Sequence, residues 1–174
     1  CGKPQVRIRI LGDLAICVGD REIALPSRKA KAMIAYLTLA PGMRETRDRL
    51  VGLLWSETED TNARASLRQL LYSLRMTFEA AGLMGLSADK SGVSLDPAVF
   101  RTDLDDFLES VDRGYPTDVQ LSLEDINSLF LCGYDDIDPS FATWMTVKRE
   151  NVRRMLIQHL EARLTDVPNQ PDET

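Results

Sequence analysis

The hydrophobic positions between residues 61 and 82 recur at steps of three and four, which is the period of one face of an α-helix. They are Ala63, Leu67, Leu70, Leu71, Leu74 and Phe78. A second stripe beside them carries Arg64, Arg68, Tyr72 and Arg75, and a third carries Asn62, Ser66, Gln69 and Ser73. The pattern predicts a long helix that packs by one face and presents charged and polar side chains on the others.

The chain before this helix begins with alternating positions. Residues 6–11 alternate apolar and basic side chains, which predicts a strand with one buried face. A second strand is expected over 14–18 and a short third one over 22–25, separated by the turn signals Gly12-Asp13 and Gly19-Asp20. Together they predict an N-terminal antiparallel sheet.

Two shorter helices are expected next. Pro26-Ser27 opens the first, which ends before Pro41-Gly42, and Thr46 is the expected N-cap of the second, which runs to Trp55. A short acidic loop joins this second helix to the long one, which is the helix-turn-helix arrangement. Two alternating runs, 83–88 and 92–95, predict a hairpin after the long helix.

Beyond Asp96-Pro97 the spacing becomes helical. We expect helices over 103–112, 122–131 and from Pro139 onward, followed by a flexible polar tail over 166–174. The expected fold class is therefore α+β: a helix-turn-helix domain over 5–97 and an all-α, TPR-like helical segment over 98–165. Residues 1–4 are expected to be a vector-derived or flexible start.

Charge supports the same division. The chain of 174 residues carries a net charge of −6. Residues 1–97 hold 14 Lys and Arg against 11 Asp and Glu, a balance of +3, whereas residues 98–174 hold 7 against 16, a balance of −9. Opposite signs indicate two modules with different partners. Three widely spaced cysteines form neither a disulfide framework nor a metal knuckle, and no apolar run spans a membrane, so a cytoplasmic location is expected.

The first 97 residues resemble the winged-helix output domain of response regulators, as it occurs in the Streptomyces antibiotic regulatory protein family. The segments LVGLLW (50–55) and LRQLLYSLR (67–75) carry most of this resemblance, and SGVSLDP (91–97) completes it. Residues 129–164 resemble the start of the bacterial transcriptional activator domain that usually follows in that family. The resemblance implies a bacterial transcription regulator whose third helix enters the major groove and whose hairpin, the wing, touches the DNA backbone or minor groove.

No motif favours an enzyme, a metal site or a cofactor. His159 is the only histidine, and no cysteine or serine is placed beside it as a nucleophile. Asp135, Asp136 and Asp138 lack the glycine and the distal glutamate of a calcium loop, so a solvated loop with a helix N-cap is expected.

The expected function is recognition of double-stranded DNA through helix 62–81, because arginine and glutamine contact base edges and cations hold phosphates. The candidate DNA-binding residues are Arg64, Arg68, Gln69, Tyr72, Ser73, Arg75, Arg47, Arg49 and Lys90. Arg28, Lys29 and Lys31 are a second candidate set for phosphate contacts. The alternative is a protein-interaction module of a larger signalling protein in which DNA binding is weak or lost. RNA polymerase or a second copy of the chain is then the candidate partner of the helical segment.

Overall fold

The N-terminal strands form a mixed four-stranded sheet. The computed structural model describes residues 6–113 and 130–165. In sheet order the strands are β3 (Arg21–Glu22), β2 (Ala15–Val18), β1 (Val6–Arg9) and β7 (Phe100–Thr102). β1 pairs antiparallel with β2 and parallel with β7. Along β1, Val6 and Ile8 are buried while Arg7 and Arg9 are exposed, as the alternation predicts.

Strand β7 corrects one sequence-based expectation. The chain after Pro97 was expected to be all helical, but Phe100–Thr102 forms a strand opposite Val6–Ile8. Three residues are too few to show an alternation, and the partner strand lies at the other end of the domain sequence. The helix expected over 103–112 follows directly, and Thr102 caps it because its Oγ1 accepts a 3.1 Å hydrogen bond from the backbone N–H of Asp105.

A second sheet has three strands in the order β4 (Arg44–Thr46), β6 (Gly92–Leu95) and β5 (Leu86–Ala88). The β5–β6 hairpin is the one predicted from the alternation. β4 was not predicted, because its residues are polar and show no apolar periodicity. It pairs antiparallel with β6, with Thr46 opposite Gly92.

The three helices of this part are α1 (Arg28–Leu39), α2 (Arg47–Leu54) and α3 (Asp60–Ala80), with a 3₁₀ turn η1 (Pro41–Met43) after α1. Ser27 caps α1 and Thr46 caps α2, as expected. The six apolar positions predicted for α3 are its six buried residues. Helix α1 is buried around most of its circumference, including Ala32, Ala35 and Tyr36. A helix that is apolar on most sides lies between two layers.

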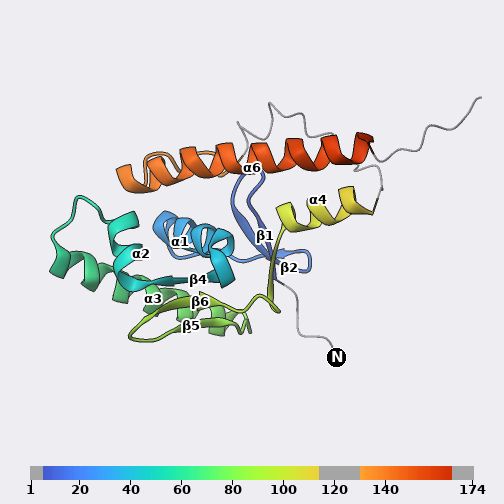
Figure 1. Cartoon of the computed structure of the whole chain (residues 1–174). Helices are drawn as coiled ribbons and strands as arrows, with labels where there is room; N and C mark the ends of the chain where they lie inside the picture. The colour runs from blue at the N-terminus through green and yellow to red at the C-terminus, as the bar shows by residue number, and fades with distance from the viewer. Residues whose placement is uncertain (1–5, 114–129, 166–174) are drawn as a thin grey trace, which may run out of the picture.

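Helix α6 (Pro139–Thr165) forms one of those layers. Helix α6 lies on one side of α1, and α3 and the β5–β6 hairpin lie on the opposite side of α1 (Figure 1). The rings of Tyr36 and Trp144 lie 4.9 Å apart, and Lys148 Nζ donates a 3.1 Å hydrogen bond to the carbonyl of Leu39 at the end of α1. Among the residues of α6 whose burial the structure describes, the buried ones are Phe141, Met145, Val152 and Leu156.

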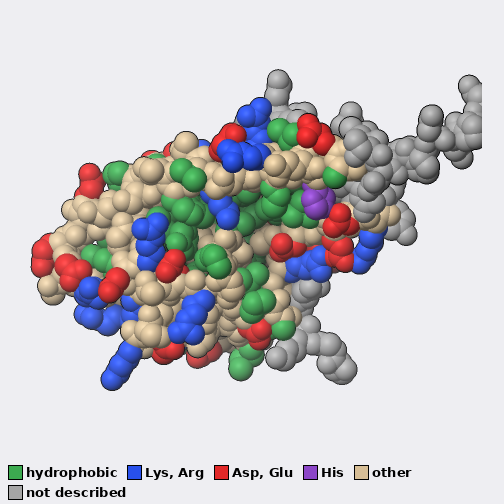
Figure 2. All heavy atoms as spheres, in the orientation of Figure 1, with side chains coloured by type: hydrophobic (Ala, Val, Ile, Leu, Met, Phe, Trp, Pro, Cys, Tyr) green, Lys and Arg blue, Asp and Glu red, His purple; other side chains and the backbone are tan. Residues whose placement is uncertain are grey.

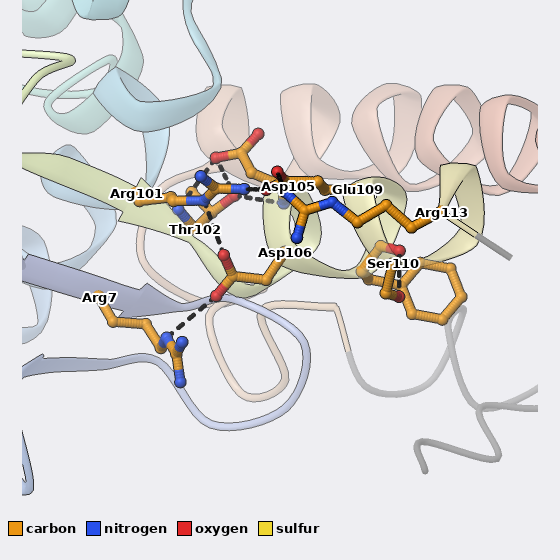
Figure 3. Close-up of polar contacts among 9 residues, drawn as sticks. Arg7, Arg101, Thr102, Asp105, Asp106, Glu109, Ser110 and Arg113 are labelled. Atoms are coloured by element: carbon orange, nitrogen blue, oxygen red, sulfur yellow. Dashed lines mark hydrogen bonds and ion pairs between the residues drawn. The ribbon is translucent and has the colours of Figure 1, made fainter. Parts of the chain in front are cut away.

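Helix α4 (Asp103–Asp112) is tied to the sheet by charged groups (Figure 3). Asp106 forms ion pairs with Arg7 on β1 at 3.0 Å and with Arg101 on β7 at 2.7 Å. Glu109 on the next turn is paired with Arg101 and with Arg113. This network fixes α4 against β1 and β7, so the second segment continues directly from the first sheet.

The described residues form a mixed α+β structure with an N-terminal sheet, and helices α1–α3 with the three-stranded sheet are consistent with a winged-helix fold. The expected helix over 122–131 falls mainly on residues 114–129, outside the described part, as do the expected flexible ends over 1–4 and 166–174. TPR-like repeats remain a prediction. Among the described residues no helix has the length and apolar character that crossing a membrane requires.

Candidate nucleic-acid interface

The outer face of α3 carries the charged and aromatic side chains predicted from its second stripe. Arg64, Arg68, Tyr72 and Arg75 are all exposed, because the apolar stripe of the same helix is packed into the core. No other described element buries these arginines. Their exposure is what a DNA-contacting helix needs, although exposure is also common on ordinary amphipathic helices.

Arg68 and Tyr72 occupy the unobstructed part of this face. Tyr72 is 62% exposed, and neither side chain forms a hydrogen bond or ion pair with any residue that the structure describes. An arginine whose five N–H donors are unoccupied can form a bidentate contact with guanine. These two side chains are therefore the most available for contact with bases.

Arg64 is engaged by two carboxylates instead. Its Nη1 lies 2.8 Å from Asp48 Oδ1 on α2, and its Nε lies 2.8 Å from Asp60 Oδ2 one turn earlier on α3. The hydrogen bonds that Arg64 donates to Asp60, and then to Asp48, raise the pKa of Arg64 above its ordinary value. A base or phosphate would have to compete with both acids for this guanidinium.

Four cations gather around the turn of the β5–β6 hairpin. This hairpin cation cluster consists of Arg44 on β4, Arg47 on α2, Arg75 on α3 and Lys90 in the turn itself. Arg47 Nε donates to the carbonyl of Asp89 at 2.6 Å, and Arg75 Nη2 donates to the carbonyl of Ala88 at 2.9 Å. Arg44 Nη2 donates to Ser91 Oγ at 2.7 Å.

The cluster could not be found from the sequence, which shows a single lysine in the hairpin. Its three arginines come from three other elements, and only the tertiary structure brings them to the turn. Arg75 contacts the hairpin at the carbonyl of Ala88. Its guanidinium holds the hairpin, and its other N–H donors are left for a further acceptor.

Asp89 organises the turn from inside. Its carboxylate accepts from Ser91 Oγ at 2.6 Å and from the backbone N–H groups of Ser91 and Gly92 at 2.7 and 2.9 Å. These hydrogen bonds, that of Ser91 Oγ first, lower the pKa of Asp89 to about 2. The turn is thus fixed in the form that places Lys90 beside the arginines.

Gln69 and Ser73 lie on a different side of α3 from Arg68 and Tyr72. With Ser66 they line a hollow of about 380 Å³, and its other wall is formed by Lys29 at the start of α1 and Trp55 at the end of α2. The third stripe predicted for this helix therefore lies on the side of α3 that faces the start of α1. The structure does not bring Gln69 and Ser73 together with the outer face.

Arg49 is also separate from the outer face. It lines a hollow of about 500 Å³ between α2 and α6, next to Leu53, Trp144 and Val147. Hydrophobic side chains gather just beneath α6, whereas acidic ones gather near the α2–α3 turn and basic ones lie over α3 and the second sheet (Figure 2). Arg47 and Arg49 are two residues apart on α2, but Arg47 contacts the hairpin turn and Arg49 lines the hollow beside α6.

The cations in the first turn of α1 mostly bind the chain itself. Arg28 forms a bidentate pair with Asp136 at 2.6 and 3.0 Å, and Lys29 Nζ donates to the carbonyl of Leu54 at 2.6 Å. Lys31 forms no such contact with the described residues. This second candidate set for phosphate contacts is therefore largely occupied. Asp136, in the exposed loop over 135–138, contacts the start of α1 through Arg28.

The remaining candidates for chemistry have structural contacts. His159 Nε2 lies 2.8 Å from Asp112 Oδ1, which links α6 to α4. Asp135 pairs with Arg149 at 2.7 Å, and Asp138 caps α6, as the sequence predicts. Within the described part of the chain, no group of three His, Cys, Asp or Glu residues is placed to hold a metal ion.

Comparison with solved structures finds a likeness in fold. No protein-family model and no curated protein matches the sequence. The solved structure of Mycobacterium tuberculosis EmbR in complex with a low-affinity phosphopeptide superposes with a TM-score of 0.56 and 19% sequence identity, over 92% of this chain and 44% of that chain. At this identity the likeness shows a shared fold alone, and the chain spans less than half the length of the EmbR chain.

Proposed function

We propose that this chain is a DNA-binding transcriptional regulator of the Streptomyces antibiotic regulatory protein type, and that it recognises duplex DNA through α3. The observation that carries the proposal is the outer face of α3, where unengaged Arg68 and Tyr72 stand beside the hairpin cation cluster. Its support is the resemblance of the sequence to that family together with the fold shared with EmbR.

The two parts of this surface have different tasks in the proposal. The cluster cations have donors left after holding the hairpin, and these bind phosphates of one strand, which positions the protein on the duplex. α3 then enters the major groove, where Arg68 and Tyr72 contact base edges. The acidic residues near the α2–α3 turn repel phosphates, so the DNA backbone is expected to lie nearer to the hairpin cation cluster.

A salt-titrated binding assay on a random-sequence duplex tests the proposal. Each phosphate contact that is lost should lower the slope of log K against log salt by about 0.9. Lys90→Ala and Arg47→Ala are each expected to reduce the slope by about one unit. Arg154→Ala is the matched control, because this exposed arginine lies on α6, which is not part of the proposed surface.

The alternative function gives a different result in the same assay. A protein-interaction module that has lost DNA binding would show no salt-dependent affinity for the duplex, and Lys90→Ala would behave as Arg154→Ala does. In that case the acidic second segment, with RNA polymerase or another copy of the chain as partner, becomes the surface to pursue.

A further inference from the structure

The turn that joins α2 to α3, residues 55–59, is held by the start of α6. The backbone N–H of Ser56 donates to Asp138 Oδ2 at 2.9 Å, and Ser56 Oγ donates to Asp138 Oδ1 at 2.6 Å. Asp138 is 8% exposed, so water contributes little to its solvation. A buried carboxylate that accepts short hydrogen bonds is a strong contact, since the bonds are charge-assisted.

The same carboxylate begins α6. Asp138 Oδ1 also accepts a 2.9 Å hydrogen bond from the backbone N–H of Ser140, in the first turn of that helix. One side chain therefore caps α6 and fixes the turn of the helix-turn-helix. A displacement of the start of α6 has to move Ser56 or break these bonds.

The opposite side of the turn is fixed by α1. Lys29 Nζ lies 4.9 Å from the centre of the Trp55 ring, in the geometry of a cation–π contact, and bonds the last carbonyl of α2. The neighbouring Arg28 binds Asp136 and the carbonyl of Gly133, in the segment that leads into α6. The turn is thus held between the starts of two helices.

This position determines where α3 begins. Thr58 N–H donates to the carbonyl of Trp55 at 3.0 Å, and Glu59 is the N-cap residue of α3. Only two residues therefore separate Ser56 from the cap of the helix that carries Arg68 and Tyr72. A shift at Ser56 is carried into the direction of α3, because the chain between them is already bonded into a turn.

We propose that Asp138 is a positioning residue for DNA recognition: it fixes the α2–α3 turn and so makes the orientation of α3 depend on the placement of α6. This inference rests on the proposed DNA-binding function. It assigns a role to a residue that contacts no DNA, and it connects the second segment of the chain to the recognition helix.

Two variants distinguish the fixing of the α2–α3 turn by Asp138 from its capping of α6. Asp138→Ser keeps an N-cap residue for α6, because serine caps about as well as aspartate, but its shorter side chain cannot reach Ser56. Ser56→Ala removes one of the two hydrogen bonds from the other side. Asp135→Ser is the matched control, since it removes a neighbouring exposed carboxylate that pairs with Arg149 on α6 and contacts neither the turn nor α1.

The first measurement is amide hydrogen exchange of residues 55–59 in the complete chain. Loss of the carboxylate should raise exchange of these amides roughly ten-fold in Asp138→Ser. In Asp135→Ser they should exchange as in the unaltered chain. Unchanged exchange of the turn in Asp138→Ser would overturn the inference.

The second measurement compares binding to a duplex selected by the unaltered chain from a random library with binding to unselected random duplex. The ratio of the two affinities should fall about ten-fold for Asp138→Ser and less for Ser56→Ala, and the double variant should equal Asp138→Ser, since both act on one contact. A lowered melting temperature with an unchanged ratio would show a merely structural role and refute the proposal. Absence of any duplex binding by the unaltered chain would refute the proposed function, and with it the role in recognition, while the exchange result would still decide whether Asp138 holds the turn.

Discussion

At the level of single residues, Arg64 and Arg68 differ in what already occupies their guanidinium groups. They lie one turn apart on the same face of α3, and the sequence assigns them the same role. Arg64 is held by Asp48 and Asp60, whereas Arg68 contacts no polar group among the described residues. Arg68 can contact a base without losing a partner, whereas Arg64 would first have to break its ion pairs with Asp48 and Asp60.

The first prediction therefore concerns Arg68→Ala. If Arg68 is bidentate to a guanine, its loss should cost about 1–3 kcal/mol on the selected duplex and much less on random duplex, where only phosphate contacts remain. Arg64→Ala should have a smaller effect on this difference. The measurement is a pair of titrations at fixed salt for each variant. Arg75→Ala is the control, because its loss should weaken binding to both duplexes alike, and equal losses for Arg68→Ala would make α3 a phosphate-binding helix.

A second prediction concerns the pH dependence of the hairpin. The pKa of Asp89 is lowered from 3.8 to about 2, so the folded hairpin favours the ionised carboxylate. Its contribution to stability is complete above the unfolded value and is lost as the pH falls through about 2. Asp89→Asn should therefore lower the protection of the Ser91 and Gly92 amides from hydrogen exchange at neutral pH. The protection of these amides should also depend less on pH below about pH 4 in this variant. A pH profile identical in shape for both proteins would contradict this.

At the level of elements, the sequence predicts helices better than short strands. α2 and α3 begin and end within two residues of the predicted bounds, because caps and a 3.6-residue period mark them. β4 and β7 were not predicted, since strands of three residues carry no period and their partners are distant in sequence. The candidate DNA-binding site could likewise be predicted from the sequence only in part. The outer stripe of α3 follows from spacing, but the cation cluster and the engagement of Arg64 depend on residues from other elements.

The third prediction uses two glycines with opposite surroundings. A Cβ added to Gly92 on β6 would overlap the carbonyl oxygen of Glu45 on β4, whereas one added to Gly52 on α2 meets nothing within 4 Å. Gly92→Ala should therefore separate β4 from β6 and destabilise the protein by about 1–3 kcal/mol. Gly52→Ala should stabilise it by about 0.5–1 kcal/mol, because alanine favours a helix interior. Urea unfolding of both variants measures the difference, and destabilisation by Gly52→Ala would contradict the assigned helix.

At the level of the whole molecule, the two segments share more than the change in charge at Pro97 suggests. Phe100, just beyond that boundary, is fully buried, and its ring stacks on Phe78 of α3 with the centroids 5.9 Å apart. The carboxylate of Asp103 accepts from the backbone N–H groups of Ile10 and Leu11, at the end of β1. The division predicted from composition thus separates two charge regions, while packing continues across it through β7 and α4.

The last prediction follows from this continuity. A fragment that ends at Pro97 lacks β7, so β1 loses its parallel partner and the cavity left by Phe100 opens beside Phe78. A fragment that ends at Arg113 keeps β7, α4 and the charged network around Asp106. The longer fragment should therefore unfold at a clearly higher urea concentration than the shorter one. Circular dichroism during urea titration measures both midpoints.

Phe100→Ala in the longer fragment tests the cause of that difference. Removal of a buried phenylalanine typically destabilises a protein by about 3–5 kcal/mol, so this variant should lose much of the difference between the two fragments. Phe107→Ala is the matched control, since this side chain on α4 is only partly buried and should cost less. Equal midpoints for the two fragments would restore Pro97 as the end of an independent folding unit. A higher midpoint that survives Phe100→Ala would instead locate the stabilisation in the ion pairs of Asp106 and Glu109, whose effect should then weaken in high salt.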